Sequence, residues 1–216
     1  MGTTRERYTQ WLSVPLDTRA YLSTLVREIG GPEIKALDLG CGFGEWLRFL
    51  AEHEGIAVDN LFGVDFHLSR VDATREMLID AVENGARCSG ELAGVLAENI
   101  WRRDLTREPS WQATPVRNID LVTMFVVTGV FEDEQLQRVL EGLAELAPRY
   151  VFVTTVSRRW RLWHGRSDES DFFERNGFQE IRRHWLPERL PSEAGMALLF
   201  PKRYWTNTSL HVYRRI

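Results

Sequence analysis

Hydrophobic residues follow two alternating patterns from about residue 34 onward. Short apolar runs with strand character alternate with longer segments whose apolar residues recur at helical spacing. The expected strands are residues 34–39, 60–64, 98–101, 119–127, 150–156, 178–186 and 209–214. The expected helices are residues 45–53, 68–82, 91–97, 132–146 and 167–176. Strands that alternate with amphipathic helices are typical of βαβ units, so the pattern predicts a doubly wound, Rossmann-like α/β fold with the polar strand 98–101 at an edge.

The first thirty residues have a helical pattern instead. Their apolar residues lie at mixed helical spacing on both sides of Pro15, which separates two expected helices. The Gly30-Gly31-Pro32 segment then ends the pattern. At 216 residues the chain fits one domain with small additions. We therefore expect an N-terminal helical cap over residues 1–30 and a single α/β domain over residues 31–216.

Composition narrows the class of protein. The apolar share of 44% and charged share of 27% are those of a globular protein, and the net charge of −4 gives no attraction to polyanions. Nucleic acid and membranes are therefore not expected partners. Two cysteines provide neither a disulfide framework nor the spacing of a zinc site, so no metal is predicted. No signal peptide or membrane span is recognisable, and we expect a cytoplasmic monomer or homodimer.

A glycine-rich turn follows the first expected strand. Gly40, Gly42 and Gly44 stand between that strand and a helix, where a ligand can approach the backbone closely. The helix start directs N–H groups and a positive dipole end at such a ligand. The G-x-G-x-G spacing differs from the G-x-G-x-x-G of dinucleotide-binding folds, and the ending of a phosphate-binding P-loop is absent. ATP, GTP and NAD are therefore disfavoured.

Two acidic residues stand at the ends of the next expected strands. Asp65 lies where a carboxylate accepts hydrogen bonds from ribose hydroxyls in doubly wound folds. Asp104 follows the third strand at the same edge of the sheet and could accept a hydrogen bond from an adenine amino group. Together with the glycine turn, these residues indicate a site for a nucleoside-containing ligand.

These residues resemble the class I S-adenosylmethionine (SAM)-dependent methyltransferase superfamily, from about residue 34 to the end of the chain. The resemblance implies a seven-stranded sheet with an antiparallel last strand, and S-adenosyl-L-methionine as cofactor. The segment from Asp38 to Gly44 resembles the motif that holds the methionine part, Asp65 the ribose-binding acid, and Phe66 the neighbour of adenine. The cofactor site that the resemblance implies consists of Asp38, Gly40, Cys41, Gly42, Gly44, Asp65, Phe66, Asp104, Leu105 and Phe125.

One departure concerns the catalytic base. Many small-molecule members of the superfamily have a His pair after the fourth strand, whereas this chain has Thr128-Gly129-Val130. Methyl transfer can proceed by proximity and orientation alone, and a base is required only where the acceptor must lose its proton. The available candidates, each of which is equally consistent with a packing or surface role, are His67, His164, His184, Glu132 and Asp133.

Aromatic and basic residues outside the expected strands suggest an acceptor pocket. Trp11, Trp160 and Trp163 could cover the carboxyl edge of the sheet, although ordinary packing explains them as well. Arg158 and its neighbours could bind an anionic acceptor, although a solvated surface is the default for such charges. With Thr128, these residues form the predicted acceptor site of a small-molecule methyltransferase.

Three alternatives stay open at the level of sequence. Cyclisation or aminopropyl transfer would use the same cofactor site, and a non-catalytic SAM-binding protein would keep the same fold. An RNA or protein acceptor lacks a basic surface in its favour.

Overall fold

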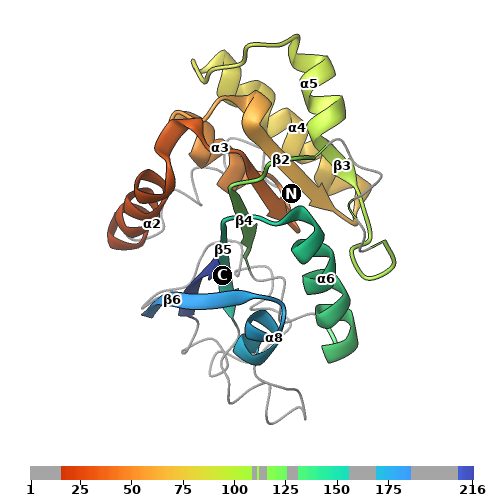
Figure 1. Ribbon diagram of the computed structural model, residues 1–216. Coiled ribbons are helices and arrows are strands. Elements are labelled where there is room, and N and C mark those ends of the chain that lie inside the picture. Colours follow the sequence, from red (N-terminus) through yellow and green to blue (C-terminus); the bar gives the residue numbers. More distant parts are fainter. Residues whose placement is uncertain (1–15, 109–110, 112–115, 126–130, 156–168, 186–208) are drawn as a thin grey trace, which may run out of the picture.

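Seven strands form one sheet in the order β3-β2-β1-β4-β5-β7-β6 (Figure 1). The structure is a computed structural model and describes residues 16–108, 111, 116–125, 131–155, 169–185 and 209–216. The strands are β1 (Ala36–Leu39), β2 (Leu61–Asp65), β3 (Ile100–Arg102), β4 (Leu121–Met124), β5 (Tyr150–Thr155), β6 (Phe178–Trp185) and β7 (Ser209–Arg215). β7 runs antiparallel to both β5 and β6, and the pairs from β3 through β5 are parallel. The predicted seven-stranded sheet with an antiparallel last strand is confirmed.

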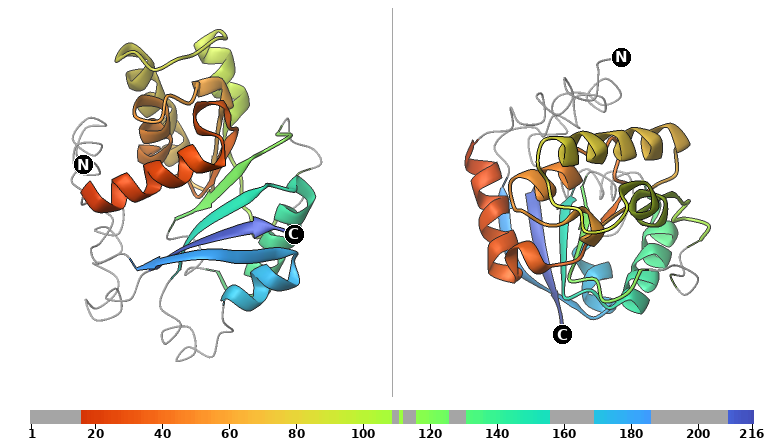
Figure 2. Two further views of the ribbon diagram at one scale, coloured as in Figure 1. Left: turned by 60° about the vertical axis from the view of Figure 1, so that its left-hand side comes forward. Right: turned by 90° about the horizontal axis from the view of Figure 1, so that it is seen from above.

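Helices cover both faces of this sheet, and the two views of Figure 2 place α2 and α6 on opposite sides. The helices are α2 (Leu16–Ile29), α3 (Glu45–Glu52), α4 (Leu68–Glu83), α5 (Leu92–Asn99), α6 (Asp133–Leu146) and α8 (Glu169–Arg175). Strand residues alternate between two cores: Ala36 and Leu121 pack with α2, α3 and α4, whereas Leu37 packs with α6 and α8. This is the doubly wound arrangement that the sequence predicts.

Element boundaries differ from the expected ones mainly around the central strands. β1 begins at Ala36 because the short 3-10 helix η1 (Gly31–Glu33) takes the chain up to Ile34, whose N–H donates to the carbonyl of Gly31. β4 begins at Leu121 because Asn118 has a left-handed backbone with φ of 56°. A second short 3-10 helix, η2 (Val58–Asn60), leads into β2. β3 lies at the sheet edge, as predicted from its polarity.

The N-terminal region is described only from residue 16 onward. α2 packs Leu22, Leu25, Val26 and Ile29 into the core that α3 and α4 share. The helix expected before Pro15 lies outside the described residues. No helix in the described part of the chain has the length and apolar character that crossing a membrane requires.

Candidate active site

The glycine turn is held against the end of β2. The N–H groups of Gly40 and Cys41 both donate to the carbonyl of Val64, at 2.8 and 2.9 Å. The turn therefore starts where β1 and β2 end together, and it leads into α3 with Gly44 as the helix N-cap. The side chain of Cys41 is buried, and burial raises the pKa of its thiol, so it packs beneath the turn as a neutral group.

Gly42 and Gly44 both need their left-handed backbone, but their surroundings differ. Gly42 has φ of 59°, and among the described residues a side-chain carbon there would find only the carbonyl of Gly40, at 4.0 Å. Gly44 has φ of 83°, and the same carbon would meet the Cα of Thr74 at 3.0 Å. Gly42 thus faces open space that a ligand can occupy, whereas Gly44 permits close packing of the turn on α4.

Thr74 of α4 holds the turn by a hydrogen bond, a role that the sequence prediction does not include. Its hydroxyl donates to the carbonyl of Gly42 at 3.1 Å and lies 3.5 Å from the Cys41 sulfur. Thr74 is fully buried on α4, between Val71 and Leu78 in the apolar stripe of that helix. A hydroxyl residue within an otherwise apolar stripe is the pattern that could have revealed it.

Asp65 joins the turn to the start of α4. Its Oδ2 accepts from the N–H of Gly42 at 3.2 Å, and its Oδ1 accepts from the N–H of His67 at 2.9 Å. The guanidinium of Arg70 lies 3.6 Å from Oδ2. The carboxylate is buried, so these donors compensate for its lost hydration. The two residues predicted to hold opposite ends of the ligand, Gly42 and Asp65, are therefore in direct contact.

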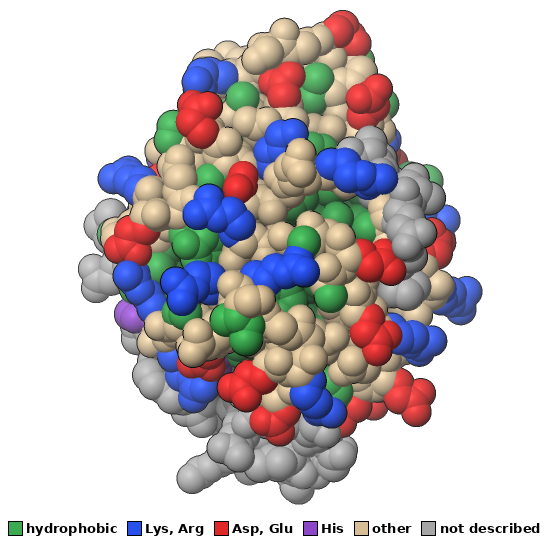
Figure 3. Space-filling view, viewed as in Figure 1, with side chains coloured by type: hydrophobic (Ala, Val, Ile, Leu, Met, Phe, Trp, Pro, Cys, Tyr) green, Lys and Arg blue, Asp and Glu red, His purple; other side chains and the backbone are tan. Residues whose placement is uncertain are grey.

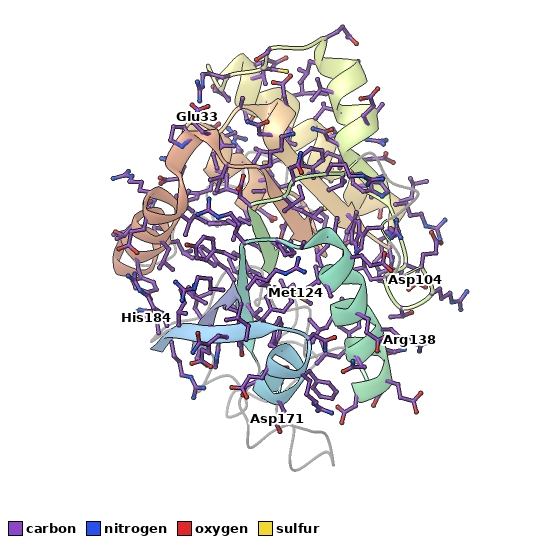
Figure 4. All side chains as sticks on the ribbon, viewed as in Figure 1. Glu33, Asp104, Met124, Arg138, Asp171 and His184 are labelled. Carbon is purple, nitrogen blue, oxygen red and sulfur yellow. The ribbon has the colours of Figure 1, made fainter. Side chains whose placement is uncertain are left out.

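Phe66 and Asp104 lie at the same edge of the sheet but differ in their exposure and contacts. Phe66 is 54% exposed and its ring lies tilted against that of His67, so part of the aromatic ring is accessible beside Asp65. Asp104, marked in Figure 4, follows β3 and accepts from both the N–H and the hydroxyl of Thr106. The hydroxyl bond contributes most to holding the pKa of Asp104 below its usual value. The side chain of Leu105 is buried in the core with α6.

Asp38 is a buried acid in the middle of the sheet. It pairs with Thr123 of β4 in the register, and the Thr123 hydroxyl donates to Asp38 Oδ1 at 2.6 Å. Burial raises the pKa of Asp38 to about 7, although the Thr123 hydrogen bond opposes this shift, and the charges of Glu45 and Asp65 add to it. Three acidic side chains, those of Asp38, Glu45 and Asp65, thus lie around the glycine turn, and a cationic ligand there would favour the ionised form of Asp38.

Phe125 follows β4 and is half-buried. Its ring packs edge-on against Trp46 of α3, with centroids 5.1 Å apart.

Among the base candidates, His67 precedes α4 and is exposed, and His184 stacks on Tyr21 at the end of β6 (Figure 4). Glu132 caps α6, the first residue of which is Asp133. The predicted residues Trp11, Thr128, Arg158, Trp160, Trp163 and His164 lie outside the described residues.

A family model and several solved structures relate this chain to methyltransferases. A family model described as a methyltransferase domain matches residues 11–209. Magnesium protoporphyrin IX methyltransferase from Synechocystis PCC 6803, with SAM bound, superposes with a TM-score of 0.63 at 17% identity, covering 93% of this chain and 79% of that one. The methyltransferase domain of bacterial CtHen1 gives 0.60 at 16% identity, covering 92% and 96%.

A third structure, a putative sarcosine dimethylglycine methyltransferase from Galdieria sulphuraria, gives a TM-score of 0.59 at 14% identity, covering 92% of this chain and 85% of that one. At these identities the structural likeness establishes the fold alone. No curated protein sequence matches the chain.

Proposed function

The chain belongs to the methyltransferase-domain family, and from this premise we propose that it transfers a methyl group from SAM to a small-molecule acceptor that carries an anionic group. Family membership confirms the resemblance to class I SAM-dependent methyltransferases and gives SAM as the cofactor. Bound SAM supplies an activated methyl group on a sulfonium. We propose that residues of the glycine turn, together with Asp65 and Phe66, bind and orient SAM.

The contact between Gly42 and Asp65 is the observation that carries this proposal. It brings the open side of the glycine turn next to a buried carboxylate, so one ligand can contact both. In this arrangement the turn accommodates the methionine part and Asp65 accepts from the ribose hydroxyls. Phe66, exposed beside Asp65, offers its ring to the adenine, and Asp104 lies further along the same edge.

The charges around the turn fit the cofactor as well. SAM carries an ammonium and a sulfonium in its methionine part, and Asp38, Glu45 and Asp65 place acidic groups around the place proposed for it. Burial is the main cause of the raised pKa of Asp38, and a positive ligand there would offset the smaller part that comes from repulsion by Glu45 and Asp65. These acidic side chains therefore fit the cationic methionine part of SAM better than the phosphates of a nucleotide.

Three features support a small acceptor over a polyanionic one. The net charge is −4, and acidic side chains lie among the basic ones on the face seen in Figure 3, which argues against a polyanionic acceptor. One structural relative is named for magnesium protoporphyrin IX, a small molecule. We further propose that residues 1–30 form a cap over the acceptor, with Trp11, Thr128, Arg158, Trp160 and Trp163 around it and the arginine pairing with the anion.

A product screen tests the proposal. The protein is incubated with SAM and a panel of small carboxylates and phosphates, and the products are identified by mass spectrometry. S-adenosylhomocysteine together with an acceptor heavier by one methylene would support methyl transfer. Methylthioadenosine as the product would show that the enzyme uses SAM for different chemistry, and SAM binding without any product would indicate a non-catalytic protein. The Gly42→Val variant serves as the cofactor-free control.

A further inference from the structure

A second polar cluster lies on one face of β6 and β7, away from the glycine turn. The hydroxyl of Ser209 and Nε2 of His211 are 2.6 Å apart on β7, and Nδ1 of His211 lies 3.0 Å from Oε2 of Glu180 on β6. Ser209 and His211 are 4% and 6% exposed. The cluster therefore has an acid, an imidazole and a hydroxyl in linear order, with each imidazole nitrogen bonded to a different partner.

The order of these groups has a chemical meaning. A carboxylate on Nδ1 holds the imidazole with its proton on that nitrogen, which leaves Nε2 to accept the hydroxyl proton of Ser209. Although burial raises the pKa of Glu180, hydrogen bonds from Arg183 and His211 outweigh that effect and leave its pKa below the usual value. Glu180 is therefore a carboxylate at neutral pH. Among the described residues, the charged or titratable neighbours of His211 include Glu180, Arg183 and Tyr213.

An irregularity in β6 builds this cluster. The register shifts between Glu180, which pairs with Tyr213, and Arg182, which pairs with Val212. In a regular strand Glu180 and Arg183 would point to opposite faces, because side chains alternate. The bulge lets both join one face, where Arg183 donates to Glu180 at 2.9 and 2.8 Å. Bulges that re-aim a side chain in this way are frequent beside active sites.

The hydroxyl end of the cluster lies at the functional edge of the sheet. Ser209 is the first residue of β7, and it pairs with Thr155 and Trp185, the last residues of β5 and β6. The glycine turn follows β1 at this edge of the sheet, and Asp65 is the last residue of β2 there. Adenosine would occupy the β2 and β3 side of this edge, so the acceptor would lie toward β4, β5 and β7 (Figure 1). Ser209 is thus on the acceptor side.

We propose that Ser209, His211 and Glu180 form a proton relay that takes up the proton released when the acceptor is methylated. This inference rests on the proposed methyltransferase function. An O–H or N–H group of the acceptor attacks the methyl carbon, which exchanges its bond to sulfur for a bond to the acceptor. The acceptor proton moves to the Ser209 oxygen while the Ser209 proton moves to Nε2 of His211. The products are methylated acceptor, S-adenosylhomocysteine and an imidazolium paired with Glu180, which later releases its proton to water.

The relay supplies a general base. In many small-molecule members of the superfamily a His pair follows the fourth strand, whereas this chain has Thr128-Gly129-Val130 there. The relay also explains why a histidine is buried with both nitrogens bonded. Ser209 would be the catalytic residue of the relay because it contacts the acceptor, whereas His211 and Glu180 act through it.

Steady-state kinetics with SAM and the acceptor identified by the product screen test the relay. Ser209→Ala and His211→Asn should each lower kcat by about 100-fold, as expected for loss of a general base. Their dissociation constants for S-adenosylhomocysteine, measured by calorimetry, should stay within about twofold of the wild type because the cofactor site is elsewhere. Gln179→Ala is the matched control, since Gln179 is exposed on the same strand beside Glu180.

Glu180→Gln distinguishes a relay from a structural network. Removing the carboxylate charge lowers the proton affinity of the imidazole, so the acidic limb of the kcat profile should move to lower pH as the plateau falls. The NMR titration of the His211 ring should move in the same direction. An unchanged pH profile, or a raised KM with unchanged kcat in Ser209→Ala, would overturn the relay while methyl transfer stands. Wild-type protein that binds SAM and methylates nothing would overturn the proposed function itself, and the relay with it.

Discussion

The hydroxyl of Thr123 donates to Oδ1 of Asp38 across 2.6 Å, between neighbouring residues of β4 and β1. Through this hydrogen bond Thr123 partly compensates the buried carboxyl group of Asp38 for its lost hydration. It opposes the effect of burial only in part, because the pKa of Asp38 still rises to about 7. The ionisation of Asp38 is therefore coupled both to folding and to any charge placed beside it.

Asp38→Asn should stabilise the protein without ligand at alkaline pH. In the unfolded chain Asp38 has an ordinary pKa, so between about pH 4 and 7 the folded protein retains a proton that the unfolded chain has released. The contribution of Asp38 to the free energy of unfolding consequently falls as pH rises through this window. The difference in free energy of unfolding between the variant and the wild type should increase in favour of the variant by at least about 1 kcal/mol from pH 5 to pH 8. Urea unfolding at both pH values measures this, and an equal difference at the two would contradict it.

The same acid should make SAM binding depend on pH. A cationic ligand beside Asp38 favours its carboxylate form, so the affinity should rise by roughly threefold or more from pH 6 to pH 8 as Asp38 ionises. Asp38→Asn should bind SAM more weakly and with a flat profile over this range. Calorimetry in two buffers of different ionisation enthalpy would also detect the proton released on binding. A variant that retains the wild-type pH dependence would assign the effect to another group.

Asp65→Ala should weaken SAM binding by at least about 1 kcal/mol, the usual cost of losing a hydrogen-bonded carboxylate. The loss includes the bond from Gly42, so the glycine turn itself should also become less well held. Asp72→Ala is the control, because Asp72 is an exposed acid on α4 that pairs only with Arg75 among the contacts described here. Unchanged calorimetric affinity in a folded Asp65→Ala variant would show that the ribose assignment is wrong.

Thr74→Val tests the support of the turn from α4. Valine keeps the shape of threonine but cannot donate to the carbonyl of Gly42, so the position of the turn is less restricted. We expect the dissociation constant for SAM to rise by about fivefold, which corresponds to one hydrogen bond of about 1 kcal/mol. Thr24→Val removes a similar bond, from Thr24 to the carbonyl of Ala20 on α2, and should leave SAM binding unchanged. Equal effects of the two variants on affinity would deny Thr74 a role in the turn.

The sequence predicts the sheet and the glycine turn well because both depend on local pattern. A short run rich in β-branched residues, such as Tyr150–Thr155, predicts a strand, and glycines between a strand and a helix mark a close backbone approach. The relay residues cannot be predicted from the sequence, because Glu180 and His211 are distant in the chain and meet only through antiparallel pairing and a bulge. The role of Thr123 is equally hidden, since it depends on which strand pairs with β1.

Gly42 and Gly44 should respond differently to alanine, although both have a left-handed backbone. A side chain at Gly44 meets the backbone of Thr74 at 3.0 Å, so Gly44→Ala should lower the free energy of unfolding by about 2 kcal/mol or more. At Gly42 only the backbone conformation is unfavourable, which costs about 1 kcal/mol, but the new methyl group occupies the space proposed for SAM.

Gly42→Ala should therefore remain folded and lose most of its affinity for SAM, and Gly42→Val should lose it completely. Gly55→Ala isolates the backbone cost, because Gly55 has φ of 68° and its nearest neighbour would be Pro32 at 3.9 Å, in ordinary contact. Urea unfolding gives the stability of each variant, and calorimetry with S-adenosylhomocysteine gives its affinity. If Gly42→Val retained wild-type affinity, the turn would serve only for packing, and the cofactor would have to bind elsewhere.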